Sequence, residues 1–563
     1  MSKYFNFLFF LGLILTGCKK NGANNSGSQT NRTPNPQHIS VLTQHNDNTR
    51  AGLNNNETAL TTSNVNSNQF GKLFTLAVDD QVYAQPLVAG DLSIGSGIHN
   101  VVLIATVNNS VYAYDGDNGT LYWQKNFTAT GMRPPNSSDM SSGWCTPYTD
   151  FAHNIGIVGT PVIDSVAKTI YFVSRSTDGT SFAQYLHAVD IASGSEQPGS
   201  PVAISASVSG SGDGSVNNMV DFDPRRNNQR QGLTLVNGVV YITYSSHCDW
   251  NPYHGWILGY NAQTLQQVIV YNDTPNGENG GIWESGVGMA ADAQGNLYIT
   301  TGNGTVGQGN LYAGSSNGTN ENNPNPAPTS LTDRAESALK LTPSGPTLLV
   351  SSFFTPTNYV DLNINDLDYG VMGTLLIPNS SYYFTGCKDG NLYLLNKDNM
   401  GGYSPASNQV QQTVPINVSL HCQPSYYLGS SNEFVYVWSE NDQLRALSFN
   451  RGSNTFAANQ IVSSEAGPTG GCGADLSVSS NGTADGTGIL WAAYAVSGDA
   501  GNTVSPGVLR AFDANNITKE IWNSKINSTD AVGNYAKFSS PTIANGHVYL
   551  PTFSGQVVVY GLK

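Results

Sequence analysis

The stretch from Val101 to Gln124 reads VVLIATVNNSVYAYDGDNGTLYWQ and predicts three consecutive β-strands. The pair Asn108-Asn109 separates the first two strands, and the turn from Asp115 to Gly119 separates the last two. β-Branched and aromatic residues suit a pleated, half-buried surface, and Asn and Gly supply the positive φ that tight hairpins need. A meander this short cannot bury its own faces. We therefore expect it to repeat along the chain.

The repeat is found, and it predicts the fold. A strand like SVYAYDGDNG recurs eight times, and it begins at Ser110, Tyr185, Gly255, Ser337, Gly390, Asp442, Gly507 and Gly555. Each copy follows two further strands, which we call A and B, and an outer strand D follows the first seven copies of this strand C. The unpaired segment Phe70–Val78 is expected to supply the eighth outer strand and so to close the ring. The sequence therefore predicts an all-β, eight-bladed β-propeller of four-stranded antiparallel blades, in preference to seven blades.

The first residues predict export rather than a part of the fold. Lys3 and the apolar run Phe5–Leu15 resemble a signal peptide, and the sequence Leu-Thr-Gly that ends before Cys18 resembles the lipobox of bacterial lipoproteins. That resemblance implies cleavage before Cys18 and a lipid anchor on it; an ordinary cleaved signal is the alternative. We assign residues 1–18 to the signal, 19–40 to a flexible linker rich in Asn, Ser, Gly and Pro, and 41–563 to one propeller domain. By the same resemblance to bacterial lipoproteins, Lys19 in place of Asp after Cys18 favours the outer membrane of the cell envelope, facing the periplasm or the surface.

The charge of the chain limits its partners. Charged residues make up 11% of the sequence, and the formal net charge is −15. Nucleic-acid binding needs a concentrated cationic surface, so we exclude nucleic acid as a partner. We expect a monomer.

The first repeat also resembles a known family. The sequence VYAYDGDNGTLYW is similar to the repeat of pyrroloquinoline-quinone (PQQ) propellers, and the resemblance extends over Gln44–Lys563. The stretches FDPRRNNQRQGL and HCDWNPYHGWILGYNAQTLQQV also resemble bacterial secreted PQQ-like proteins. The family includes quinoprotein dehydrogenases and propeller lipoproteins that act as scaffolds without a cofactor.

The resemblance to the dehydrogenases implies a cofactor site that this sequence matches only in part. The family places a vicinal Cys-Cys disulfide and a Trp against PQQ, with Glu, Asn and Asp around calcium. No Cys-Cys pair or haem attachment motif is present here, although Trp283 and Glu284 could imitate part of the site. We therefore expect a binding or scaffold protein first, and a diverged oxidoreductase using PQQ with calcium, or a metal, second. A polysaccharide-active enzyme using the carboxylates Glu284 and Asp368 is the third hypothesis.

The longest loops are expected on one face of the propeller, where strands D and A and strands B and C are joined. They span residues 128–154, 207–230, 247–254, 302–336, 355–368 and 525–537. The scarce charged and sulfur residues lie in these loops or at the starts of blades on the same face, and long loops on a rigid scaffold often carry function. The predicted ligand-binding residues are Arg230, His247, His254, Trp283, Glu284, Lys388 and Lys537. We expect the partner to be an envelope protein, a glycan or a small anion, while ion pairs that tie loops together are the structural alternative.

The five remaining cysteines map to the same face, and disulfides are the default in an exported protein. Cys145 with Cys248 is the first predicted pair, and Cys422 with Cys472 is a weaker second, which leaves Cys387 odd. His247 and His254 flank Cys248, but no CxxC or HxxxH spacing accompanies them, so we expect no metal site.

Overall fold

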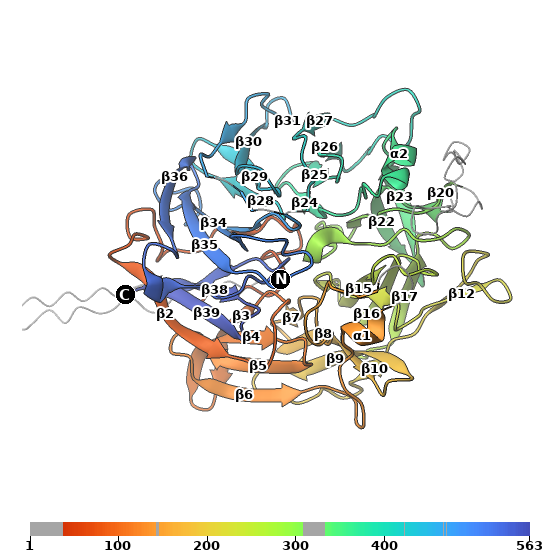
Figure 1. The fold of residues 1–563 in the computed structure, drawn as a ribbon, viewed down its shortest axis with the longest axis horizontal. Helices are drawn as coiled ribbons and strands as arrows, with labels where there is room; N and C mark the ends of the chain where they lie inside the picture. Colours follow the sequence, from red (N-terminus) through yellow and green to blue (C-terminus); the bar gives the residue numbers. More distant parts are fainter. Residues whose placement is uncertain (1–37, 142–145, 308–332, 422, 466, 469) are drawn as a thin grey trace, which may run out of the picture. The chain divides into compact units, whose positions relative to one another are not determined.

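The structure is a computed structural model, and it describes residues 38–563 except 142–145, 308–332, 422, 466 and 469. The chain divides into two units, Met1–Gln37 and His38–Lys563, of which the second is described. The predicted signal and Cys18 lie outside the described residues. The second unit is built of eight antiparallel blades that follow one another around a common centre (Figure 1). The predicted eight-bladed propeller is confirmed, and the seven-bladed alternative is wrong.

The first four blades follow the chain, with the innermost strand given first. Blade 1 contains β3 (Leu87–Ile94), β4 (Gly97–Ala105), β5 (Ser110–Asp115) and β6 (Leu121–Asn126). Blade 2 contains β7 (Val162–Asp164), β8 (Thr169–Thr177), β9 (Phe182–Asp190) and β10 (Val202–Ala203). Blade 3 contains β14 (Thr234–Val236), β15 (Val239–Ser246), β16 (Trp256–Asn261) and β17 (Gln267–Asn272). Blade 4 contains β18 (Ala290–Ala291), β19 (Leu297–Thr300), β22 (Ala338–Ser344) and β23 (Thr347–Phe354).

The other four blades complete the ring. Blade 5 contains β24 (Thr374–Leu376), β25 (Tyr382–Gly386), β26 (Asn391–Asn396) and β27 (Gln412–Pro415). Blade 6 contains β28 (Ser425–Leu428), β29 (Glu433–Val437) and β30 (Arg445–Asn450), with β31 (Thr455–Phe456) and β32 (Ile461–Val462) both beside β30. Blade 7 contains β33 (Asp475–Ser479), β34 (Ile489–Ala495), β35 (Gly507–Asp513) and β36 (Asn516–Asn523). Blade 8 contains β37 (Thr542–Ala544), β38 (His547–Pro551), β39 (Gln556–Leu562) and β2 (Phe70–Ala77).

Strand β2 closes the ring as the repeat count predicts. It pairs antiparallel with β39, and Phe70 lies opposite Leu562 at one end of the register. The ring of Phe70 is fully buried, with its centroid 5.0 Å from that of Trp522 and 5.5 Å from that of Trp491. Burying a side chain of this size contributes about 2–3 kcal/mol, so the closure is held by packing as well as by backbone hydrogen bonds.

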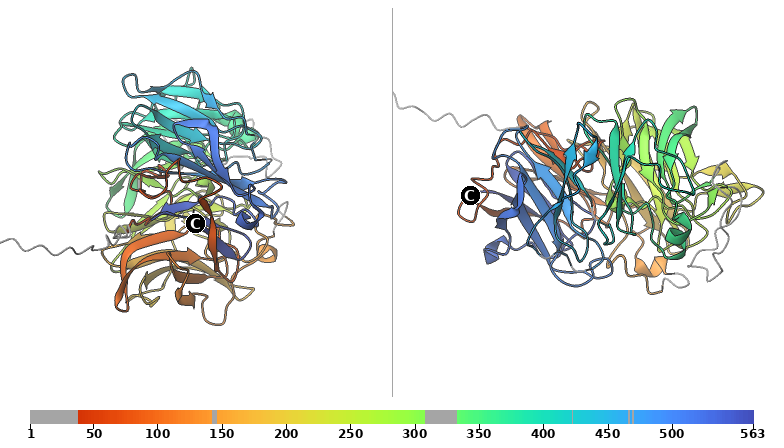
Figure 2. Two further views of the ribbon diagram at one scale, coloured as in Figure 1. Left: turned by 90° about the vertical axis from the view of Figure 1, so that its left-hand side faces the viewer. Right: turned by 90° about the horizontal axis from the view of Figure 1, so that it is seen from above.

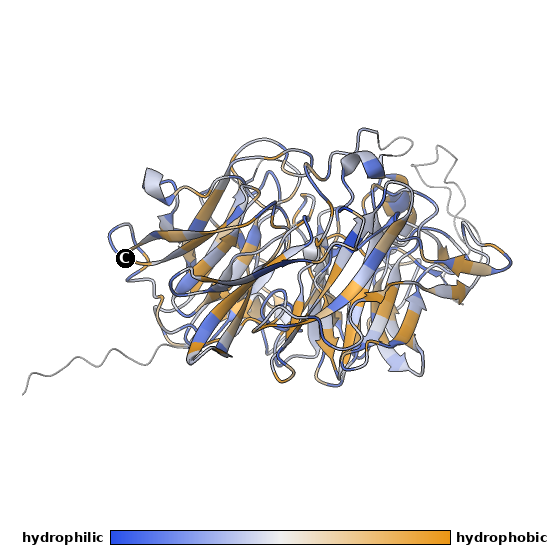
Figure 3. Ribbon diagram, turned by 90° about the horizontal axis from the view of Figure 1, so that it is seen from below, coloured by the Kyte–Doolittle hydropathy of each residue, from blue (hydrophilic) through white to orange (hydrophobic). Residues whose placement is uncertain are grey.

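The hydrophobic core lies between neighbouring blades rather than in one central mass. One cluster joins Trp491 and Leu509 of blade 7 to Ile543 and Val558 of blade 8. Both faces of each sheet are covered in this way, which explains why inner strands such as VVYITYSS lack a clean alternation of apolar and polar residues. Hydrophobic residues accordingly follow the strands, and the connecting loops are largely hydrophilic (Figure 3).

The remaining elements decorate this ring. They are β1 (Leu53–Asn54), β11 (Ser207–Ser209), β12 (Met219–Asp221), β13 (Asn227–Asn228), β20 (Val306–Gly307), β21 (Asp333–Arg334), the helices α1 (Ser137–Met140) and α2 (Tyr359–Ile364), and the 3-10 turns Glu284–Gly286 and Ser528–Asp530. Helices α1 and α2 lie on the same face of the ring (Figure 2). Both belong to loops that join an outer strand to the next inner strand, which is the face that the sequence predicts to be elaborated.

The innermost strands of the eight blades surround a central channel. The segment from Val41 to Asn54 fills the end of this channel opposite the face that carries α1 and α2. Its backbone or side chains hydrogen-bond the innermost part of every blade in turn, at Val88, Ile163, Leu233, Ala291, Leu376, Tyr426, Val478 and Ile543. Just before it, the backbone N–H of Ile39 donates to Asn545 in the turn between β37 and β38, at 2.6 Å. The chain therefore enters the ring at the face of the A–B turns and makes a circuit of the channel there.

Arg50 anchors this segment at the centre. Its side chain is fully buried and donates to the carbonyl of Gln44 (2.7 Å), to the carbonyl of Met289 (3.1 Å) and to the hydroxyl of Thr234 (2.6 Å). Burial lowers the pKa of the Arg50 guanidinium to about 10, which leaves it charged at neutral pH. One side chain thus ties the segment to blades 3 and 4.

Candidate functional site

A cavity of about 490 Å³ opens at the end of the channel that the N-terminal segment leaves free. Loops that join D to A and B to C strands line it, and they come from every part of the ring. Its charged and titratable residues are Asp150, Arg230, Asp249, Asp366, Asp368, Lys388, His421, Asp499 and Lys537. The elaborated face predicted from loop length is therefore the face that holds the cavity.

A layer of amides and hydroxyls forms the floor of the cavity. The Gln423 amide donates to the carbonyls of Ser285 (2.7 Å) and Phe538 (2.9 Å). Its carbonyl oxygen accepts from the amide of Gln44 (3.2 Å) and from the hydroxyl of Ser540 (2.9 Å). Because all these groups are satisfied within the protein, the floor separates the cavity from the buried N-terminal segment.

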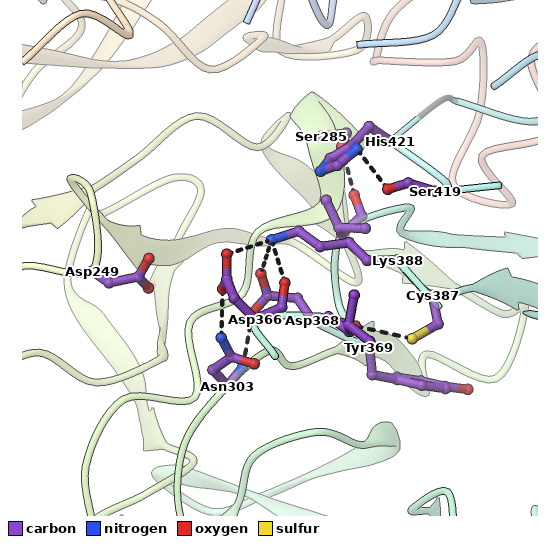
Figure 4. A network of polar contacts seen from close by, with 12 residues as sticks. Asp249, Ser285, Asn303, Asp366, Asp368, Tyr369, Cys387, Lys388, Ser419 and His421 are labelled. Atoms are coloured by element: carbon purple, nitrogen blue, oxygen red, sulfur yellow. Dashed lines mark hydrogen bonds and ion pairs between the residues drawn. The ribbon is translucent and has the colours of Figure 1, made fainter. Parts of the chain in front are cut away.

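One side of the cavity carries an ion-pair network centred on Lys388 (Figure 4). The Lys388 ammonium lies 2.6 Å from a carboxylate oxygen of Asp368 and 3.4 Å from one of Asp366. Asn303 holds both acids, since its backbone N–H donates to Asp368 (2.9 Å) and its side-chain amide donates to Asp366 (2.7 Å). Burial acts to raise the pKa of Asp368, but the Lys388 ammonium and the hydrogen bond from Asn303 together hold that pKa below the ordinary value.

Asp249 faces this network from blade 3. Its carboxylate points toward Asp366 (Figure 4) and accepts a hydrogen bond of 2.6 Å from the hydroxyl of Tyr253. Burial, followed by the negative charges of Asp368 and Asp366, raises the pKa of Asp249 to about 7. We call Asp249, Asp366, Asp368 and Lys388 the acidic side, because three carboxyl groups there face one ammonium.

Arg230 rises from the floor between two aromatic rings. Its guanidinium carbon lies 5.3 Å from the ring centroid of Trp283 and 5.0 Å from that of Phe538. Its Nε donates to the carbonyl of Trp283 at 3.0 Å, which fixes the plane of the guanidinium. Stacking of this kind leaves the edge of the fork available for an anionic group.

Lys537 lies beside Arg230 and belongs to the loop before blade 8. Its side chain is 6% exposed, and its ammonium donates to the carbonyl of Gly501. Burial lowers its pKa and the Arg230 charge acts in the same direction, whereas Cys472 and the negative charge of Asp150 act to raise it. Among the described residues, no carboxylate lies within 4.0 Å of the side chains of Lys537 or Arg230. We call Arg230 and Lys537 the cationic side.

Four of the seven predicted ligand-binding residues line the cavity, namely Arg230, Trp283, Lys388 and Lys537. The structure does not bring the other three to its surface. His247 is buried between the Tyr148 hydroxyl (2.7 Å) and the Arg175 guanidinium (2.5 Å), and burial lowers its pKa well below the ordinary value. His254 is held by the carbonyl of Asp213 (2.9 Å) and the hydroxyl of Thr274 (3.0 Å).

Glu284 is the third residue that lies away from the cavity. Its side chain is fully buried, and one carboxyl oxygen accepts from the backbone N–H of Thr300 at 3.0 Å. Burial raises its pKa to about 8, so it is mostly protonated at neutral pH. The predicted carboxylate pair of Glu284 and Asp368 is therefore wrong as a site that flanks a substrate, because a substrate cannot reach Glu284.

The cysteine predictions have different outcomes. Cys248 takes part in a disulfide, while its predicted partner Cys145 lies outside the described residues, so this pair stays a prediction. Cys472 is a buried free thiol, and the predicted pair of Cys472 with Cys422 is therefore wrong; Cys422 itself lies outside the described residues. Cys387 is free, as the odd count implies.

Sequence reasoning missed Asp249 and Asp366 as neighbours of Lys388. Asp249 follows Cys248 directly, and Asp366 stands two residues before Asp368. Both residues lie in the long loops of the elaborated face, and this position could have marked them as candidate site residues. Their proximity to Lys388 could not be predicted from the sequence, because this contact brings together loops of blades 3 and 5.

Comparison with known proteins identifies the fold. No protein-family model matches the chain, and no curated protein matches its sequence. The quinohemoprotein alcohol dehydrogenase from Comamonas testosteroni is similar in structure, with a TM-score of 0.55 and 11% identity over 93% of this chain and 80% of that one. A europium-containing methanol dehydrogenase aligns with a TM-score of 0.57 and 10% identity over 93% of this chain and 98% of that one. The chain has the propeller fold of the quinoprotein dehydrogenases.

The cavity does not fit the cofactor that the quinoprotein dehydrogenases imply. No two cysteines are adjacent in the sequence, so no vicinal disulfide can form. The Arg230 guanidinium lies over the ring of Trp283, and the carboxylate of Asp368 is held in an ion pair by Lys388. No group of three or more His, Cys, Asp and Glu side chains in the described part of the chain could hold a metal ion. The quinoprotein propeller is thus present with a different set of groups at its mouth.

Proposed function

We propose that this chain is a lipid-anchored binding protein of the cell envelope that takes a small organic anion into the cavity at the channel mouth. The anchor on Cys18 and the outer-membrane location rest on the signal and lipobox resemblance of the N-terminal sequence. In the part of the chain that the structure describes, we find no helix with the length and apolar character needed to cross a membrane. We expect the protein to work as a monomer.

The observation that carries this proposal is the cationic side. Arg230 and Lys537 line the cavity close together, and neither has a carboxylate within 4.0 Å among residues 38–563 as described. Two neighbouring buried cations that no carboxylate contacts directly are costly for the protein alone. A carboxylate from a ligand would offset that cost, and the stacked Arg230 can bind it with two parallel hydrogen bonds.

The size of the cavity favours a small molecule over an envelope protein or a glycan chain. At about 490 Å³, it falls within the range of about 300–1,000 Å³ that encloses small ligands. Aromatic side chains of Trp283, Phe538 and Tyr83 line it together with the charges. We therefore expect an anion with an apolar or aromatic part.

The test is calorimetric titration of the purified full chain with aromatic carboxylates, beginning with phenylacetate. We expect saturable binding that Arg230→Gln weakens about 10- to 100-fold, because a charge-assisted contact contributes about 1.5–3 kcal/mol. The matched control is Arg225→Gln. Arg225 also donates from Nε to a carbonyl (Asp139, 3.0 Å) and stacks on two rings (Phe182 and Trp250, each 4.8 Å), but it does not line the cavity.

Two results would contradict the proposal. Equal losses in Arg230→Gln and Arg225→Gln would place the effect outside the cavity. Saturable binding of PQQ that requires calcium, with no binding of simple carboxylates, would restore the oxidoreductase hypothesis.

A further inference from the structure

Lys537 faces the acidic side across the cavity, while Arg230 comes from the loop that leads into blade 3 and stacks on Trp283 and Phe538. Lys537 belongs to the loop before blade 8 and contacts Gly501 of blade 7, whereas Asp249 belongs to blade 3 and Asp366 precedes blade 5. In a ring of eight blades, blade 8 lies opposite blade 4, between blades 3 and 5 (Figure 1). The ring therefore places Lys537 across the cavity from Asp249 and Asp366.

The acidic side has more negative charge than its own partners offset. Within the described part of the chain, Lys388 is the one ammonium that contacts Asp366 and Asp368, with its nitrogen 3.4 Å from Asp366 and 2.6 Å from Asp368. Asp249 accepts from the neutral hydroxyl of Tyr253. An ammonium group from a ligand between Asp249 and Asp366 would relieve the repulsion among these carboxylates.

Two further acids line the cationic side but do not neutralise it. Asp499 is exposed, and its oxygens accept from the backbone of Gly501 (2.9 Å) and the amide of Asn502 (2.8 Å) in its own loop. Asp150 lines the cavity, but it lies beyond 4.0 Å of both Arg230 and Lys537. Asp150 thus acts on Arg230 and Lys537 only from a distance, and direct contact with the two cations is left for a ligand.

We propose that the ligand is a zwitterion of the amino-acid or short-peptide class. Its carboxylate binds Arg230 and Lys537, its ammonium binds Asp249 and Asp366, and its apolar part lies between the two sides. This inference rests on the proposed function, because it takes the anion site as one half of a dipolar site. An inorganic cation fits the acidic side less well, since no metal-binding group of three or more side chains occurs among the described residues.

The experiment compares three peptides that differ only in charge. The full chain is titrated calorimetrically with Ala-Phe, with N-acetyl-Ala-Phe, which lacks the ammonium, and with Ala-Phe amide, which lacks the carboxylate. We expect Ala-Phe to bind about 10- to 100-fold more tightly than either derivative. Asp249→Asn should weaken binding of Ala-Phe but not of the acetylated peptide, and Lys537→Met should weaken binding of both. Asp292→Asn is the matched control, because Asp292 lies in the A–B turn of blade 4, away from the cavity.

Three results would overturn the zwitterion. If N-acetyl-Ala-Phe binds as tightly as Ala-Phe, or if none of the three peptides binds while simple carboxylates do, the anion site stands without a dipolar ligand. If calcium binds saturably and Asp249→Asn abolishes that binding, the acidic side belongs to a metal. If neither the peptides nor the carboxylates bind, the proposed function fails as well.

Discussion

Buried charges have different surroundings at the two ends of the central channel, the closed end filled by Val41–Asn54 and the open end that holds the cavity. At the closed end, Arg50 is fully buried, and the protein's own carbonyls and hydroxyls accept its hydrogen bonds. At the open end, Lys537 is 6% exposed, and among the residues that the structure describes its ammonium donates to one carbonyl, that of Gly501. Both cations lie inside one propeller, but only Arg50 is surrounded by several hydrogen-bond acceptors of the protein itself.

This difference separates structural from functional polar groups. A buried charge with a full set of partners stabilises the fold in which it sits, and its removal leaves several acceptors unpaired. A buried charge that no opposite charge contacts destabilises the fold. Such a charge can still serve function if a ligand of opposite charge binds it. The closed end is therefore expected to govern stability, and the open end to govern binding.

The largest expected effect is at the closed end. Arg50→Met leaves the carbonyls of Gln44 and Met289 and the hydroxyl of Thr234 without their donor. We expect the free energy of unfolding to fall by about 3 kcal/mol or more, measured by chemical denaturation. Arg133→Met is the control, because Arg133 is 47% exposed in its ion pair with Asp139 and should matter by less than about 1 kcal/mol. Equal effects of the two substitutions would contradict the structural role of Arg50.

A smaller effect is expected at Glu284, which lies below the cavity. Burial raises its pKa to about 8 in the folded protein, above its value of about 4.5 in an unfolded chain. Its contribution to stability is fully present below pH 4.5 and is lost as the pH rises toward 8, because only the unfolded state releases the proton in that range. The free energy of unfolding of Glu284→Gln, taken relative to that of the wild type, should therefore be higher at pH 8 than at pH 5 by roughly 1–3 kcal/mol. A change in thermal stability that is independent of pH would show that Glu284 is ionised in the fold.

The smallest expected effect is at the open end. Lys537→Met removes a buried ammonium that has no carboxylate within 4.0 Å among the described residues. We expect stability to be unchanged or to rise by about 1 kcal/mol, while ligand binding is weakened. Lys340→Met is the matched control, since Lys340 also donates to a carbonyl (Lys397, 3.0 Å) but has Asp398 at 3.8 Å and lies outside the cavity. A large loss of stability in Lys537→Met would place this residue with the structural charges and would remove the contrast between the two ends.

The same physical reasoning explains why charge reversal is a poor test at this site. A carboxylate in place of Lys537 would be buried beside the carbonyl of Gly501, with no donor to replace the ammonium. Such a variant would lose stability and binding together. Neutral substitutions separate the two quantities.

The sequence alone determined the fold and the face of interest. Strand and turn patterns repeat locally, so the eight blades, the closing strand Phe70–Ala77 and the loop-rich face can all be read from short stretches. Four of the seven predicted binding residues line the cavity for the same reason, because their loops belong to that face.

Only the tertiary structure decided which groups meet. Asp249 and Asp366 come from blades 3 and 5 and approach each other only because the ring closes. His247, His254 and Glu284 stand in the right loops, but their side chains turn into the protein, where hydroxyls, carbonyls or backbone N–H groups bind them. Loop position follows from the chain, whereas side-chain direction and burial depend on packing between distant segments, and it is burial that decides whether a charge serves the fold or a ligand.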